Sequence, residues 1–276
     1  MKFTLVTATY NAAQTLPSLL DSLASQTYRK FNVIIQDGAS ADNTVVIAES
    51  YRARLPRLLL ESTADCGIYD AWNRALARTA DELGEWILFL GADDQLASSH
   101  TLKNVADFLN NVSAEVDFIA GNLIFTCAGV LTGRELIPQK IDSIPTSVVY
   151  SMPVGHTALF HRRRLFKKIN FNPYYKIAGD YDFLMRTWLD PFQGIHIPEV
   201  ITYMNLTGIS SNPKVAHRQA YECFRVRLQK SWRIALKLYF YAEYDIVRSS
   251  IKRICYKNPL SKFFYNALRR LKKTIS

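Results

Sequence analysis

Short apolar runs alternate with amphipathic segments along the first 95 residues. The apolar runs are rich in β-branched and aromatic residues, which is typical of buried strands, and they lie at 2–9, 32–37, 57–61 and 85–90. The segments between them have helical spacing, at 15–25, from about 43 to 54, and at 67–79. Strands joined through helices form parallel sheets, so this alternation predicts a doubly wound, mostly parallel α/β sheet flanked by helices.

The rhythm changes after residue 95. A helix is expected near 100–110, a strand at 117–121 followed by a hairpin through residue 131, and a helix at 180–188. No internal repeat or low-complexity linker interrupts residues 1–212, so we expect one continuous α/β body. A helical extension should follow at 213–276.

Composition and charge agree with a folded body and a distinct tail. Of the 276 residues 49% are hydrophobic and 21% charged, which excludes a disordered or collagen-like chain. The formal net charge of +10 is uneven: residues 214–276 hold 16 lysines and arginines against three acidic residues. The 213 residues before them hold 18 basic and 21 acidic residues. A slightly acidic body is therefore joined to a strongly basic extension.

The basic extension has three interpretations. Lys and Arg alternate with Phe263, Phe264, Tyr265 and Leu268, a pattern typical of a segment that lies on anionic lipid. A solvated helical face and a nucleic-acid-binding surface have similar compositions. No recognised nucleic-acid module accompanies the basic residues, so we expect an anionic membrane surface as the partner and no nucleic acid.

Cysteine use and the lack of long apolar segments predict the compartment. The cysteines are far apart, form no C-x-x-C pair, and stand at 66, 127, 223 and 255. No basic-then-apolar leader opens the sequence, and no run of about 18 apolar residues occurs. We expect reduced thiols and a cytoplasmic protein, peripheral at the inner face of the cell membrane.

Acidic residues follow the expected parallel strands. Asp37 ends the second strand, Asp65 follows the third, and Asp93 and Asp94 follow the fourth. Ligands of such sheets bind at the carboxyl ends of the strands, where clustered carboxylates repel one another unless a cation lies among them. A single Asp could simply cap the next helix. Two adjacent carboxylates exceed what one cap needs, and they suit a hard divalent cation on a diphosphate.

Several nucleotide-binding classes lack their signatures here. No G-x-G-x-x-G follows the first strand, and there is no Walker lysine loop. The sequence therefore argues against a dinucleotide oxidoreductase and a P-loop enzyme.

A combination of motifs resembles family 2 glycosyltransferases, which are inverting enzymes of the GT-A fold. The resemblance is strongest within residues 1–95, in five segments: VTATYNAAQTL, SLASQTY, FNVIIQDGASADNT, DCGIYDAWNRAL and GEWILFLGADD. The resemblance resumes at Gly155-His156-Thr157, at 176–186 and at 207–211. The chain looks most like the bacterial branch that builds capsule, exopolysaccharide and lipopolysaccharide. The resemblance implies a nucleotide-sugar-binding half at 1–95 and a half for acceptor and catalytic base at 96–212.

On the donor side the resemblance implies roles for the strand-end residues. Thr9 and Tyr10 would line the nucleotide pocket, with the Tyr10 ring on the base. Asp37 would accept a hydrogen bond from the base, and Asp65 would lie near the base or ribose. The pair Asp93–Asp94 matches the acidic metal motif of the family; Asp93 would help bind the donor, and Asp94 would be the direct ligand of Mg2+ or Mn2+.

On the acceptor side Asp180 matches the catalytic base, and Asp182 is the alternative. Residues two apart in a helix lie on different faces, so both cannot serve as the base; Asp182 could instead be a helix N-terminal carboxylate. His156 and Arg186 fall in matching segments as acceptor-side or secondary residues. His156 could equally be a buried structural histidine.

The sequence departs from the family pattern at several positions. Cys66 replaces the customary basic residue after Asp65, which puts in question a cationic contact to the donor phosphates. Gly91, Ala75 and Thr207 also differ from the usual residues, but every essential acid is present.

These observations predict a metal-dependent, inverting hexosyltransferase of cell-surface polysaccharide biosynthesis. It would move a sugar from a nucleotide diphosphate sugar to a hydroxyl of a lipid-linked glycan. A general base and a bound cation suffice for a single displacement, so no nucleophilic Ser or Cys is needed. The alternatives are a non-catalytic binder of sugar nucleotides or glycans, a sugar nucleotidyltransferase, and a basic nucleic-acid-binding protein.

Overall fold

The structure of the protein is a computed structural model that describes residues 3–78, 83–127, 129–138, 148, 150–187, 193–206 and 213–257. The chain divides into two compact units, Met1–Ser211 and Asn212–Ser276. The motif at 207–211, Trp188 of the expected helix, and the aromatic and basic residues after 257 lie outside the described residues.

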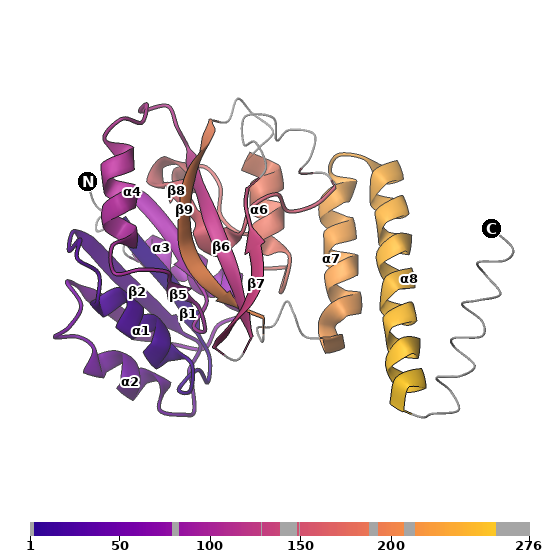
Figure 1. Ribbon diagram of the computed structural model, residues 1–276, viewed down its shortest axis with the longest axis horizontal. Helices are drawn as coiled ribbons and strands as arrows, with labels where there is room; N and C mark the ends of the chain where they lie inside the picture. The colour runs from indigo at the N-terminus through magenta and orange to yellow at the C-terminus, as the bar shows by residue number, and fades with distance from the viewer. Residues whose placement is uncertain are drawn as a thin grey trace, which may run out of the picture. The chain divides into compact units, whose positions relative to one another are not determined.

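The first half of the larger unit is the expected parallel sheet with its crossover helices (Figure 1). Its strands are β1 (Phe3–Thr9), β2 (Phe31–Asp37), β3 (Leu58–Ser62) and β4 (Trp86–Leu90), in the order β3-β2-β1-β4. All three pairings between them are parallel. The helices are α1 (Leu16–Ala24), α2 (Thr44–Ser50) and α3 (Ile68–Arg78). The alternation of strands and helices in the sequence is therefore confirmed.

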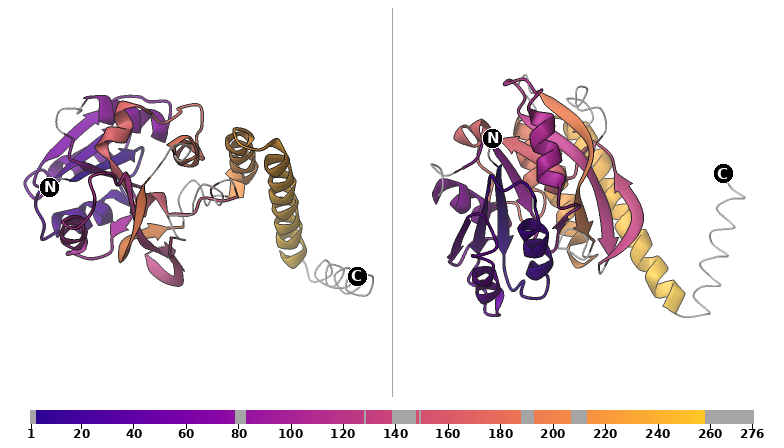
Figure 2. Two further views of the ribbon diagram at one scale, coloured as in Figure 1. Left: turned by 90° about the horizontal axis from the view of Figure 1, so that it is seen from above. Right: turned by 60° about the vertical axis from the view of Figure 1, so that its left-hand side comes forward.

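The second half continues the same sheet. Its strands are β5 (Gln95–Leu96), β6 (Phe118–Cys127), β7 (Val130–Leu136), β8 (Leu159–Arg162) and β9 (Gly194–Asn205). Within the described residues the sheet has nine strands in the order β3-β2-β1-β4-β8-β6-β9-β5, with β7 paired to β6. The helices are α4 (Thr101–Leu109) and α6 (Gly179–Thr187). The long strand β6 lies between β7 and β9, and the three strands run side by side in the right-hand view of Figure 2.

The sequence pattern predicts β6 and the hairpin to β7 but not β8 or β9. Strand β8 has four residues and joins β4 to β6 through antiparallel pairs. Strand β9 contains Pro198, which lies where the register of β6 and β9 shifts between Ala120 and Asn122. Proline is tolerated at such an irregularity because a ladder hydrogen bond is already missing there.

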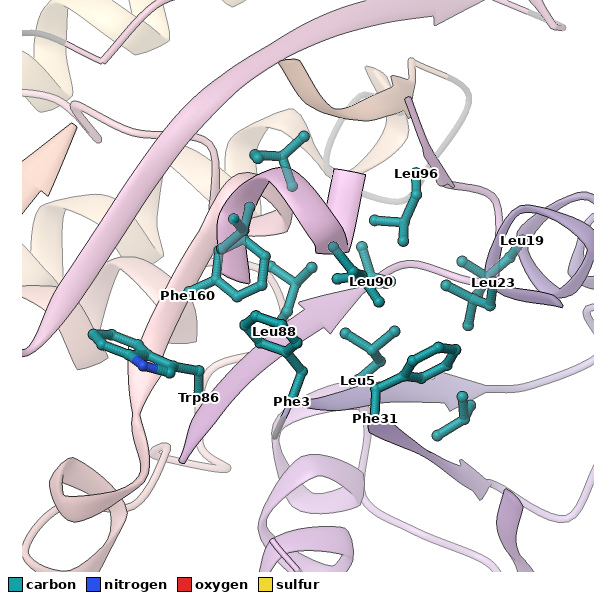
Figure 3. Close-up of a cluster of buried hydrophobic side chains, with 14 of the residues drawn as sticks. Phe3, Leu5, Leu19, Leu23, Phe31, Trp86, Leu88, Leu90, Leu96 and Phe160 are labelled. Atoms are coloured by element: carbon teal, nitrogen blue, oxygen red, sulfur yellow. The ribbon is translucent and has the colours of Figure 1, made fainter. Parts of the chain in front are cut away.

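The core of the larger unit lies between the sheet and the helices that cover it. Phe3 and Leu5 of β1, Leu88 and Leu90 of β4 and Phe160 of β8 converge in one cluster (Figure 3). All five residues of β4 are fully buried. A strand covered on both faces is apolar throughout, and the polar residues that follow it therefore mark the edge of the sheet.

The smaller unit contains helices α7 (Ala216–Leu228) and α8 (Trp232–Lys257). The two helices lie side by side (Figure 1) and are joined by Phe224 against Tyr239 and by His217 Nδ1, 2.6 Å from Glu243 Oε2. Among the described residues, no helix combines the length and apolar character needed to cross a bilayer. The helical basic extension expected from the sequence is thus present up to residue 257.

Candidate active site

Asp37 connects the ends of β1 and β3 with the loop after β2 at the carboxyl edge of the first strands. Thr9 and Asp37 are direct partners in the pairing of β1 and β2. Thr9 Oγ1 donates to Asp37 Oδ1 at 2.8 Å, Ser62 Oγ donates to Oδ2 at 2.6 Å, and the amide and hydroxyl of Ser40 also donate to the carboxylate. Burial raises the pKa of Asp37, but these hydrogen bonds outweigh it and the pKa is lowered. Asp37 is therefore an ionised, buried anchor of the edge, and its contact to a base stays a prediction.

Tyr10 and Asp65 meet across Gly38. The Tyr10 side chain is 69% exposed. A Cβ atom placed on Gly38 would lie 2.9 Å from Asp65 Oδ2 and 3.4 Å from Tyr10 Cδ2. Asp65 Oδ1 accepts the Gly67 amide at 2.8 Å, which fixes the carboxylate. An open aromatic ring beside a fixed carboxylate can stack on a base and accept from a ribose or base donor.

Asp93 and Asp94 form a tight acidic turn after β4. The Gly91 amide donates to Asp94 Oδ2 at 2.8 Å, and the backbone of Asn205, at the end of β9, also donates to Asp94. Asp94 is 2% exposed, and burial followed by the charge of Asp93 raises its pKa to about 7. Burial also raises the pKa of Asp93. A Cβ atom on Gly91 would lie 3.0 Å from an oxygen of each carboxylate, so this position favours glycine.

The acidic turn fits a divalent cation by the chemistry of its donors. Carboxylate oxygens are the ligands that Mg2+ and Mn2+ prefer, and Mg2+ is usually held by one or two carboxylates together with substrate phosphates. Burial and the neighbouring charge of Asp93 make ionisation of Asp94 costly, and a cation would relieve that cost. Among the described residues no group of three or more His, Cys, Asp or Glu side chains could hold a metal ion. The cation would therefore rest on Asp94, with Asp93 beside it and the phosphates of a ligand completing its shell.

Asp180 lies in the first turn of α6, held by a residue of α3. Its Oδ1 accepts the Tyr181 amide at 2.8 Å and lies 3.2 Å from the hydroxyl of Tyr69. The same hydroxyl donates to the Ile177 carbonyl at 2.7 Å. A Cβ atom on Gly179 would lie 2.6 Å from the Tyr69 ring, so glycine is needed for this close approach.

Asp182 lies in a different environment from Asp180. It is 1% exposed, and Arg186 Nε donates to its Oδ2 at 2.8 Å while the Arg186 guanidinium also donates to the Asn170 carbonyl. This pair, one turn apart, links α6 to the segment before it. The geometry favours Asp182 and Arg186 as structural partners, which leaves Asp180 as the candidate base.

His156 is part of an aromatic cluster inside the unit. Its ring stacks on Trp72 at 5.2 Å and on Phe89 at 5.5 Å between centroids, and His161 lies 5.0 Å away. Burial, and then the charge of His161, lowers the pKa of His156 well below its usual range. Burial lowers the pKa of His161 to about 3. Both rings are neutral at pH 7, and this packing favours the structural role of His156 that the sequence left open.

Two further residues, Tyr69 and Lys176, carry no signal of function in the sequence but lie beside the residues described above. Tyr69 lies within the run DCGIYDAWNRAL, where its spacing indicates only a core position. The ammonium of Lys176 donates to the Cys66 carbonyl and, at 3.2 Å, to the Pro173 carbonyl. Tyr69 connects α3 to the start of α6, and Lys176 connects the segment before α6 to the loop before α3. No local pattern reveals a partner about 110 residues away.

Comparisons with known proteins define the class. The family model of glycosyl transferase family 2 matches residues 4–172, and the chain therefore belongs to glycosyl transferase family 2. The PGL/p-HBAD biosynthesis glycosyltransferase of Mycobacterium bovis (strain BCG / Pasteur 1173P2) is 31% identical over 240 residues, which cover 86% of this chain and 87% of that protein. The protein is thus a glycosyltransferase, and the resemblance seen in the sequence is confirmed.

Solved structures agree with the family. The crystal structure of Staphylococcus aureus TarS 1-349 in complex with UDP is 26% identical with a TM-score of 0.62, covering 82% of this chain and 64% of that one. The mannosyltransferase PcManGT from Pyrobaculum calidifontis, in complex with GDP-Man and Mn2+, has a TM-score of 0.65 at 18% identity and covers 98% of this chain and 80% of its own. This likeness shows the fold, and the predicted mixed α/β GT-A class is confirmed.

Proposed function

We propose that this glycosyltransferase moves a sugar, with inversion, from a nucleotide diphosphate sugar to a hydroxyl of a glycan acceptor with the help of Mg2+ or Mn2+. The observation that carries the proposal is the buried acidic turn, in which Asp94 has a pKa of about 7 beside Asp93. A bound cation would offset the cost of keeping the buried Asp94 carboxylate ionised next to the charge of Asp93.

Each residue at the edge has a part in the proposed reaction. Tyr10 stacks on the base, Asp65 holds the nucleoside, and Asp94 with Asp93 holds the cation. When bound, the cation neutralises the charge that builds up on the departing diphosphate. Asp180 accepts the proton of the acceptor hydroxyl. At the same time the oxygen of that hydroxyl bonds to the anomeric carbon of the sugar, and the bond between that carbon and the diphosphate breaks. A general base of this kind contributes about 10²–10⁴-fold to the rate.

The donor can be tested by thermal unfolding with UDP, GDP, dTDP and CMP, each with and without Mn2+. TarS, which is similar in sequence and fold, has been crystallised with UDP, so UDP is the first candidate. At 100 times its dissociation constant a ligand adds about 2.7 kcal/mol, a shift of roughly 5–10 °C for a chain of this size. We expect a shift that needs both one nucleotide and Mn2+. If no nucleotide changed the unfolding temperature, with or without Mn2+, the result would instead support a non-catalytic glycan-binding homologue.

The acceptor is proposed to be lipid-linked, with the enzyme peripheral at the inner face of the cell membrane. The 16 basic residues of 214–276 support this, because each Lys or Arg near an anionic surface contributes about 1 kcal/mol. On α8 the side chains of Trp232, Phe240 and Tyr241 are 62–67% exposed and add apolar contact area.

Removing residues 260–276 tests the membrane surface. The removed segment holds five lysines and arginines, so binding to vesicles containing phosphatidylserine should weaken at least 100-fold. Donor hydrolysis should be unchanged, and phosphatidylcholine vesicles serve as the control. Equal binding of both chains to anionic vesicles would contradict the proposal.

A further inference from the structure

The hydroxyl of Tyr69 lies between the backbone and the carboxylate of one segment. Tyr69 belongs to the first turn of α3, and its side chain is 4% exposed. Its oxygen is 2.7 Å from the Ile177 carbonyl oxygen and 3.2 Å from Asp180 Oδ1. One buried phenol therefore reaches two acceptors that are three residues apart and more than 100 residues distant in sequence.

The surrounding packing leaves the phenol little freedom. Gly179 approaches one face so closely that a Cβ atom there would lie 2.6 Å from the ring. Phe171 is stacked at 5.9 Å and Trp72 stands edge-on at 5.4 Å between centroids. Burial, and then the charge of Asp180, raises the pKa of Tyr69 well above its usual value. The phenol therefore stays protonated at any working pH.

A tyrosine hydroxyl has one hydrogen to donate and lone pairs to accept with. While Asp180 is ionised, that hydrogen can be shared between the carboxylate and the Ile177 carbonyl. Once Asp180 has taken a proton, it can donate to the Tyr69 oxygen while the Tyr69 hydrogen turns fully to the carbonyl. The phenol can thus hold Asp180 in the same place in both protonation states.

We propose that Tyr69 is the positioning residue of the catalytic base, holding Asp180 in one orientation before and after it accepts the proton of the acceptor hydroxyl. The inference rests on the proposed function, in which Asp180 is that base. Phenylalanine would keep the ring against Gly179 and lose only the hydroxyl.

The test compares Tyr69→Phe with the wild type in transfer assays over pH 5–9. The variant should have kcat lowered about 10- to 100-fold, the range for a hydrogen bond to a charged group, with the donor KM unchanged within about twofold. The acid limb of the kcat profile should move to higher pH by about one unit, because the ionised carboxylate has lost a donor. Tyr51→Phe is the matched control: Tyr51 is another buried tyrosine, whose hydroxyl lies 3.4 Å from the Pro17 carbonyl. It should keep both kcat and the profile.

Asp180→Asn, measured alongside, separates the two claims. If it keeps full transfer, Asp180 is not the base and both claims fail. If Asp180→Asn loses transfer while Tyr69→Phe leaves kcat unchanged or leaves the acid limb of the kcat profile at the same pH, the assignment of Asp180 as the base is retained. The positioning role of Tyr69 is then overturned. Adding Tyr69→Phe to Asp180→Asn should cause no further loss, since the hydroxyl would act through the carboxylate. An additional 10-fold loss in the double variant would also overturn the inference.

Discussion

Asp94→Asn is expected to lower transfer at least about 10³-fold and to abolish the Mn2+-dependent stabilisation by nucleotide. The substitution keeps the size of the side chain and removes the charge that would hold the cation, so stabilisation of the departing diphosphate is lost. Transfer rates at saturating donor and thermal unfolding with nucleotide and Mn2+ measure both effects. Asp107→Asn, an exposed carboxylate paired with Lys103, should change neither.

The same variant should be more stable than the wild type in the absence of metal. A carboxyl group whose pKa is raised on folding to about 7 destabilises the folded state as the pH rises above its unfolded value near 3.9. Asp94→Asn removes that cost, so its metal-free unfolding at pH 8 should require more denaturant. Lower stability together with retained metal-dependent binding would identify Asp94 as a structural residue and refute the metal site.

Acid should destabilise the protein through its buried histidine pair, His156 and His161. Both have pKa values below the unfolded value of about 6.5, so the unfolded chain binds more protons as the pH falls through that value. The contribution of these two histidines to the free energy of unfolding is therefore nearly independent of pH well above pH 6.5. It falls progressively below that pH, as the histidines of the unfolded chain take up protons. Between pH 7.5 and 5.5 each histidine should reduce the free energy of unfolding by about 1.4 kcal/mol.

Titration of Asp94 changes the free energy of unfolding in the opposite direction over the same pH range. The effect of the histidines should therefore be measured in the Asp94→Asn protein. There, urea unfolding at the two pH values should give a loss of about 2.7 kcal/mol from the two histidines. Adding His161→Phe, into a pocket already lined by Phe89 and Phe183, should halve that loss. His161→Leu provides a second apolar replacement. An unchanged pH dependence in both replacements would show that His161 is not buried as a neutral ring.

The first half of the fold could be predicted because its elements are local. Each of β1 to β4 is a short apolar run between amphipathic helices, and the connections force parallel pairing. The second half depends on contacts between distant segments. The four residues of β8 are too few to show the alternation of a strand, and Pro198 within β9 is more typical of a loop than of a strand. Neither strand carries a local signal that outweighs these features.

The candidate site divides in the same way. The position of the acidic turn followed from a buried strand that ends in Asp93–Asp94. Its electrostatics did not, because the pKa of Asp94 is raised first by burial, which depends on segments distant in sequence such as the end of β9, and only then by the charge of Asp93. The role of the Tyr69 hydroxyl could not be predicted for a similar reason. An aromatic residue on the inner face of a helix is expected to be a core residue, and the two acceptors of this hydroxyl are more than 100 residues away in the sequence.

The contact between Lys176 and the Cys66 carbonyl has a consequence for how the chain could be divided. The ammonium is bound to a backbone oxygen and comes from the second half of the unit, so the positive charge at this loop does not depend on the side chain at position 66. A fragment ending near residue 95 would contain Asp37, Asp65 and Asp94 but not this cation. The charge at the loop before α3 is therefore complete only when the second half of the unit is present.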